Sequence, residues 1–83
     1  MPSVENALAL ANLAVQCDAR GEVRPAIYYY KEAVQLLDSV CAENPQQPNI
    51  SSLYKKIHEY DNRAQLLQYQ GKIKMMIQVS SLY

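Results

Sequence analysis

The chain has no phenylalanine or tryptophan, and its 83 residues include two glycines, four prolines and one histidine. It also has no apolar run near the ~20 residues that a helix needs to cross a bilayer. Basic and acidic residues each number eight, so the formal net charge is zero. Nucleic-acid binding needs a basic excess, and this balance argues against it. The hydrophobic content of 49% excludes a disordered tail. We expect one small cytoplasmic domain that does not insert into membranes.

The sequence offers no set of residues that would carry catalysis. His58 is the single histidine, and no cysteine or serine lies at a helical spacing from which it could be activated. The acidic residues do not cluster as metal ligands, and neither glycine belongs to a phosphate-binding loop. Cys17 and Cys41 are expected to be reduced, although their spacing alone permits a disulfide. We therefore expect a non-catalytic segment with no metal and no cofactor, which leaves open catalysis elsewhere in a host protein.

Glycine and proline divide the chain into three segments with helical periodicity. Gly21 and Pro25 mark the first break, and residues 44–49 mark the second. The predicted helices cover about residues 3–20, 22–43 and 50–71. Short connections make consecutive helices antiparallel, so the predicted fold is an all-α antiparallel three-helix bundle. It is expected to occupy residues 1–71, followed at 72–83 by a helix extension or a linker.

The first predicted helix carries more apolar surface than two neighbouring helices need. One apolar stripe lies beside a second, and part of this surface is left for a partner. The first stripe contains Val4, Ala7, Leu8, Ala11, Ala14 and Val15, and the second contains Leu10, Leu13 and Cys17.

Asp18 and Arg63 are expected at matching heights on the first and third helices. Asp18 lies 14 residues after Val4, and Arg63 lies 14 residues after Asn49. At 1.5 Å per residue, both stand ~21 Å from the same end of the bundle. An ion pair between them would set the register of two helices that no loop connects. The alternative is that both side chains face water.

The ordered residues of all three segments resemble the MIT (microtubule-interacting and trafficking) domain. The likeness covers about residues 4–71, and its most specific part is the third run below. Within the family, residues 13–16 and 28–33 look most like the first MIT copy of calpain-like cysteine proteases of endosomal sorting. The three runs are Leu13-Ala14-Val15-Gln16-x-Asp18-x-x-Gly21, Ala26-x-x-x-Tyr30-x-x-Ala33-x-x-x-Leu37 and Lys56-Ile57-x-Glu59-Tyr60-x-x-Arg63-Ala64-x-x-Leu67.

This resemblance implies a protein-interaction module that binds the C-terminal tails of ESCRT-III subunits. Such binding would recruit a host protein from the cytoplasm to endosomes or other membrane-remodelling sites. The domain is expected to be a monomer, and the partner tail is expected to lie between two helices as a helix or an extended strand.

The departures from the family pattern favour one of the two grooves. Members that take a helical motif between the second and third helices usually have leucine where this chain has Asp61, and often an acid where it has Gln65. The predicted site is therefore the groove between the first and third helices. Its predicted lining consists of Ala7, Leu10, Ala11, Leu13, Ala14, Lys56, Glu59 and Leu66.

Two other interpretations stay open at this point. A tetratricopeptide-type hairpin would explain Ala14, Gly21 and Tyr30, but the second helix is about two turns too long and no further copy follows. A self-associating structural bundle would pair the Leu10/Leu13/Cys17 stripe and residues 73–77 between chains.

The zero net charge hides an uneven distribution along the chain. Residues 1–48 contain three basic and six acidic residues, whereas residues 49–83 contain five basic and two acidic ones. The acidic helical pair and the basic third helix attract each other. A groove bordered by the third helix would therefore offer a basic wall to an acidic tail.

Overall fold

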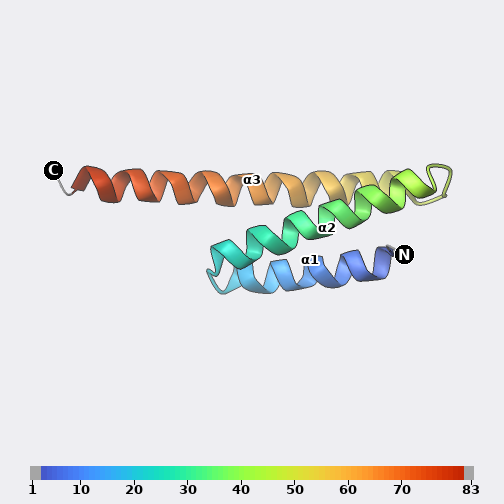
Figure 1. The fold of residues 1–83 in the computed structure, drawn as a ribbon, viewed down its shortest axis with the longest axis horizontal. Helices are drawn as coiled ribbons and strands as arrows, with labels where there is room; N and C mark the ends of the chain where they lie inside the picture. Colours follow the sequence, from blue (N-terminus) through green and yellow to red (C-terminus); the bar gives the residue numbers. More distant parts are fainter. Residues whose placement is uncertain (1–2, 82–83) are drawn as a thin grey trace.

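Three α-helices form the fold of this chain in the computed structural model, which describes residues 3–81 and the side chains of residues 3–71. They are α1 (Val4–Ala19), α2 (Val23–Glu43) and α3 (Ile50–Ser81). Consecutive helices run in opposite directions (Figure 1), and no strand occurs within residues 3–81. The predicted all-α antiparallel three-helix bundle is confirmed.

The ends of α1 are determined by its flanking residues. Ser3 caps the start, because its hydroxyl oxygen accepts a hydrogen bond of 3.1 Å from the backbone N–H of Asn6. At the other end, Gly21 adopts a φ of 78°, a left-handed conformation that glycine adopts without strain. The backbone N–H of Glu22 then reaches the carbonyl of Cys17 at 2.9 Å, and that of Gly21 reaches Asp18 at 3.1 Å. These two bonds form a Schellman motif, which turns the chain sharply into α2.

Proline and asparagine define the limits of α2. Pro25 lies in its first turn, where the missing N–H removes no helical hydrogen bond. The helix ends before Asn44, and Pro45 follows, a residue that cannot continue the hydrogen-bond ladder. The connection to α3 is held by two turns, in which Gln47 donates to Asn44 at 3.3 Å and Ile50 donates to Gln47 at 3.2 Å.

The core is built around α2, which packs along both other helices, whereas α1 and α3 approach each other only weakly. Two buried clusters together draw residues from all three helices. Leu37 is the largest side chain that is fully buried, and five fully buried alanines allow the helices to approach closely. These alanines are Ala7, Ala14, Ala26, Ala33 and Ala64.

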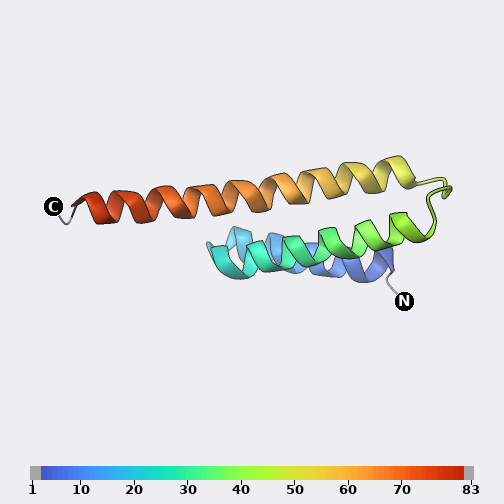
Figure 2. The ribbon, with the colours of Figure 1, turned by 45° about the horizontal axis from the view of Figure 1, so that its top comes forward.

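The third helix is much longer than the bundle that it belongs to. It contains 32 residues, or ~48 Å, against 16 residues and ~24 Å for α1. Figures 1 and 2 both show α3 continuing past the turn that joins α1 to α2, so that the molecule measures 56 × 18 × 17 Å. Gly71 lies inside this helix and does not end it. Within the described residues, no helix combines the length and the apolar character that a membrane span requires.

The central position of Leu37 leads to a stability prediction. We expect Leu37→Ala to lower the free energy of unfolding by about 2–5 kcal/mol, because it leaves a cavity where all three helices meet. Leu66→Ala is the matched control, since the Leu66 side chain is 44% exposed and its loss should cost less than about 1 kcal/mol. Urea unfolding followed by circular dichroism measures both. Equal losses in the two variants would contradict this account of the core.

Candidate partner-binding surface

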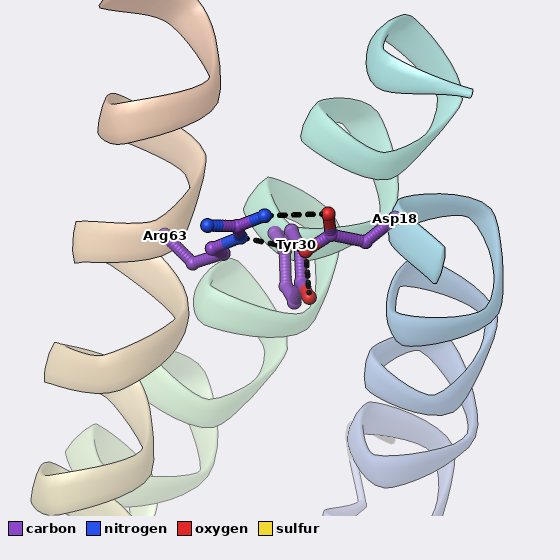
Figure 3. A network of polar contacts seen from close by, with 3 residues as sticks. All are labelled: Asp18, Tyr30 and Arg63. Atoms are coloured by element: carbon purple, nitrogen blue, oxygen red, sulfur yellow. Dashed lines mark hydrogen bonds and ion pairs between the residues drawn. The ribbon is translucent and has the colours of Figure 1, made fainter. Parts of the chain in front are cut away.

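A single carboxylate joins the three helices. Asp18 lies in the last turn of α1, and it accepts hydrogen bonds from Arg63 of α3 and Tyr30 of α2 (Figure 3). Arg63 Nε lies 2.6 Å from Asp18 Oδ2, and Arg63 Nη2 lies 2.7 Å from Oδ1, so the guanidinium contact is bidentate. The hydroxyl of Tyr30 donates to Oδ2 at 3.0 Å. The structure thus brings together Asp18 and Arg63, the two residues that the sequence places at the same height.

Near neutral pH the network keeps Asp18 and Arg63 charged and Tyr30 neutral. The Arg63 hydrogen bonds hold the pKa of Asp18 below its ordinary value, and the hydrogen bond from Tyr30 adds to this effect. Burial, followed by the nearby Asp18 carboxylate, raises the pKa of Tyr30 to about 12. The same carboxylate raises the pKa of Arg63. A bidentate pair that is ionised near neutral pH is suited to holding helices in place and not to transferring protons.

Aromatic packing fixes the tyrosine of this network. The ring of Tyr30 stacks on that of Tyr60 from α3, with centroids 5.9 Å apart and planes inclined by 27°. Tyr60 also packs against both buried clusters. The hydroxyl of Tyr30 is therefore held at the edge of the core, where it reaches Asp18.

The positions of Asp18 and Arg63 identify the helical faces that α1 and α3 turn toward each other. Residues three, four or seven positions apart share a face of a helix. Successive spacings of three and four residues form one stripe along a helix, and we define the α1–α3 face by six residues of the stripes that contain Asp18 and Arg63. They are Leu8, Ala11 and Val15 on α1, and Lys56, Glu59 and Leu66 on α3. Val15 is 51% exposed and Leu66 is 44% exposed.

The eight residues that the sequence assigned to the groove occupy three different environments. Ala7, Ala11 and Ala14 are buried, so they allow close helix packing and offer almost no surface to a partner. Lys56, Glu59 and Leu66 lie on the α1–α3 face with Arg63. Leu10 and Leu13 instead share a face with Cys17, seven and four residues further on, and this face is turned away from that of Asp18.

Leu8 and Val15 belong to the α1–α3 face but were not among the predicted groove residues. The signal that finds them is their spacing from Asp18, ten and three residues earlier in the same helix. That signal is useful only once the partner of Asp18 is known, because the partner shows which side of α1 is turned toward α3.

The remaining reactive side chains do not assemble a chemical site within the described residues. Cys17 and Cys41 are free and belong to separate buried clusters, and burial raises the pKa of both thiols. His58 is exposed, and its Nε2 lies 3.1 Å from Nδ2 of Asn62 in a contact along α3. No group of three or more potential metal ligands occurs in the part of the chain that was searched.

One comparison with known proteins gives a match. The family model described as MIT (microtubule interacting and transport) domain matches residues 4–69, which include α1, α2 and the part of α3 that packs on them. No curated relative matches the chain. The matched residues contain all three members of the Asp18 network.

We expect the Asp18 network to contribute measurably to stability. The Asp18 side chain is only 16% exposed, so Asp18→Ala leaves the donors of Tyr30 and Arg63 without their acceptor and should cost about 1–3 kcal/mol. The Arg63 side chain is 40% exposed, and solvent reduces its share. A double-mutant cycle with Arg63→Ala measures the coupling, with Gln16→Ala as an exposed control on α1. Unchanged stability in Asp18→Ala would refute the structural role of the pair.

The lowered pKa of Asp18 also predicts a pH dependence. A carboxyl whose folded pKa lies below its unfolded value contributes stability that is fully present above the unfolded value, here 3.8. This stability is lost as the pH falls through the folded pKa. The stability difference between wild type and Asp18→Asn should therefore be constant between about pH 7 and pH 5 and shrink below about pH 4. Urea titrations at each pH test this, and a difference that persists to about pH 2 would count against it.

Proposed function

The chain belongs to the MIT (microtubule interacting and transport) domain family, and on this premise we propose that it binds the C-terminal tails of ESCRT-III subunits. The family consists of non-catalytic helical modules that bind peptide motifs of partner proteins. Membership favours this function over the tetratricopeptide interpretation. Tail binding would recruit a host protein to endosomes or to other sites of membrane remodelling.

The observation that carries the proposal is the exposed apolar surface on two helices that barely touch. Val15 on α1 and Leu66 on α3 both lie on the α1–α3 face, and each is at least 44% exposed. Between them, Asp18 and Arg63 join the helices through a bidentate contact. Apolar side chains on both sides of a fixed polar link are suitable anchors for a peptide that lies along the face.

The length of the α1–α3 face favours an extended peptide. Val4 and Asp18 are 14 residues apart, which is ~21 Å along α1. An extended chain rises ~3.3 Å per residue, so about six residues would span this distance. Ala11 is 2% exposed and brings no bulk to the face, which leaves room for the backbone of a peptide.

Charge on α3 favours an acidic peptide. Lys56 and Arg63 lie seven residues apart on the α1–α3 face, with Glu59 between them. Arg63 is already paired with Asp18, so Lys56 is the basic group of this face that an acidic segment would meet. The other junction of α3 is less suitable for an apolar anchor, because Asp61 there accepts a hydrogen bond of 3.0 Å from Gln65 Nε2.

The proposed site therefore differs in part from the groove expected from the sequence. It uses Ala11, Lys56, Glu59 and Leu66 from the predicted set and adds Leu8 and Val15. Ala7 and Ala14 contribute from the core by keeping the helices close, and Leu10 and Leu13 are assigned to a neighbouring surface.

A peptide-binding screen tests the proposal. The 83-residue chain is titrated against fluorescent peptides that represent the C-terminal tails of all ESCRT-III subunits, and anisotropy gives the dissociation constants. We expect at least one tail to bind, and Val15→Asp and Leu66→Asp each to weaken it more than about tenfold, because each places an unpaired charge at an apolar contact.

Leu13→Asp is the matched control for Val15→Asp. It makes the same kind of change at a similarly exposed position of the same helix, but on the face of Cys17, and it should change the affinity less than about threefold. If no tail binds below about 1 mM, the ESCRT-III assignment fails. If Leu13→Asp abolishes binding and Val15→Asp does not, the tail occupies a different face.

A further inference from the structure

The α3 side of the α1–α3 face continues past the end of α1. The first helix ends at Ala19, at the height of Arg63, whereas α3 runs on to Ser81. Figures 1 and 2 show the last part of α3 beyond the turn that joins α1 to α2, with no other helix of residues 3–81 beside it. We call residues 70–81 of this helix the α3 extension.

Helical spacing places three residues of the α3 extension in line with Arg63. At 100° per residue, Gln70 and Lys74 each lie ~20° from Arg63 around the axis of α3. By the same count, Ile77 lies ~40° from Arg63. Leu66, which is 44% exposed, precedes them on the same side of the helix, ~60° from Arg63. The stripe therefore passes from the α1–α3 face onto the α3 extension without a break.

The charge of the α3 extension is entirely basic. Residues 62–83 contain Arg63, Lys72 and Lys74 and no acidic residue. Arg63 is paired with Asp18, which leaves the two lysines to attract a partner. Only Lys74 lies in line with Arg63, because Lys72 lies ~180° around the helix from it. An acidic peptide that leaves the α1–α3 face at Arg63 would therefore meet Lys74 next.

We propose that the tail peptide which binds the α1–α3 face continues along the α3 extension, where it contacts Lys74 and Ile77. This inference rests on the proposed function and adds a second part to the same site. Arg63 and Ile77 are 14 residues apart, which is ~21 Å along α3 and about six residues of an extended chain. With about six residues on the α1–α3 face, the whole site would hold about twelve. Pairing of two α3 extensions is disfavoured, because both are basic.

The positions of two lysines predict the charge pattern of the tail. Lys56 and Lys74 are 18 residues apart in α3, which is ~27 Å. An extended peptide covers this distance in about eight residues. Leu66 lies between the two lysines along the helix, and Ile77 follows them. We therefore expect acidic residues about eight positions apart in the tail, with an apolar residue between them and another beyond the second.

Anisotropy titrations of the full 83-residue chain test the proposal. The probe is the fluorescent ESCRT-III tail that binds most tightly in the screen above, used whole and shortened by about six residues from each end in turn. Lys74→Glu and Ile77→Asp should each weaken binding of the whole tail more than about threefold, because each places a negative charge against the peptide. One shortened tail should bind the wild type and both variants alike, because it no longer reaches the α3 extension.

Lys72→Glu and Val79→Asp are the matched controls for these two variants. They make the same kinds of change at positions ~180° and ~160° from Arg63 around α3. Each should change the affinity for the whole tail less than about twofold. Circular dichroism melts verify that all four variants keep the folded bundle.

Three results would overturn the proposal and leave the proposed function intact. The first is a loss with Lys72→Glu equal to that with Lys74→Glu, or no loss with either. The second is a shortened tail, confined to the α1–α3 face, that binds as tightly as the whole one. The third is self-association of the wild type in sedimentation velocity that Ile77→Asp abolishes, which would assign the α3 extension to a second copy. A screen in which no tail binds would refute the proposed function and this inference together.

Discussion

The arrangement of this bundle depends on the bidentate contact between Asp18 and Arg63. It joins the first and third helices, which no loop connects and which otherwise approach each other only weakly. The hydrogen bond from Tyr30 adds the second helix to the same carboxylate, and the stacking of Tyr30 on Tyr60 keeps the donor in place. The hydrogen bonds from Arg63 keep the pKa of the aspartate below its ordinary value, although its partial burial acts in the opposite direction.

The same contact determines which surfaces the bundle offers to partners. It fixes the rotation of α1 and α3 about their axes, so Val15 and Leu66 lie on one face while Leu13 lies on another. The α1–α3 face is the one that we propose for an extended peptide.

The sequence predicts the fold well, and it predicts positions along the helices better than the faces on which they lie. Gly21, Pro25 and residues 44–49 divide the chain where the structure has turns, and the family resemblance on residues 4–71 agrees with the MIT match at 4–69. The heights of Asp18 and Arg63 follow from counting residues. Counting does not give the rotation of a helix, and one residue changes the direction of a side chain by 100°. For that reason the contact between Asp18 and Arg63 is needed to distinguish the face of Val15 from the face of Leu13, two residues away on α1. The hydrogen bond from Tyr30 to Asp18 could not be predicted from residue spacing either, because it depends on how α2 packs against α1.

The position of the ion pair in the chain has a kinetic consequence. Most of the core packing joins helices that are neighbours in sequence, whereas Asp18 and Arg63 are 45 residues apart. Closing that long loop costs more chain entropy than forming either hairpin, so the two hairpins form at lower cost than the three-helix contact. From this topology we expect the α1–α3 junction to form last, after α2 has aligned both neighbours. On this expectation, the face proposed for peptide binding is also the last part of the bundle to form.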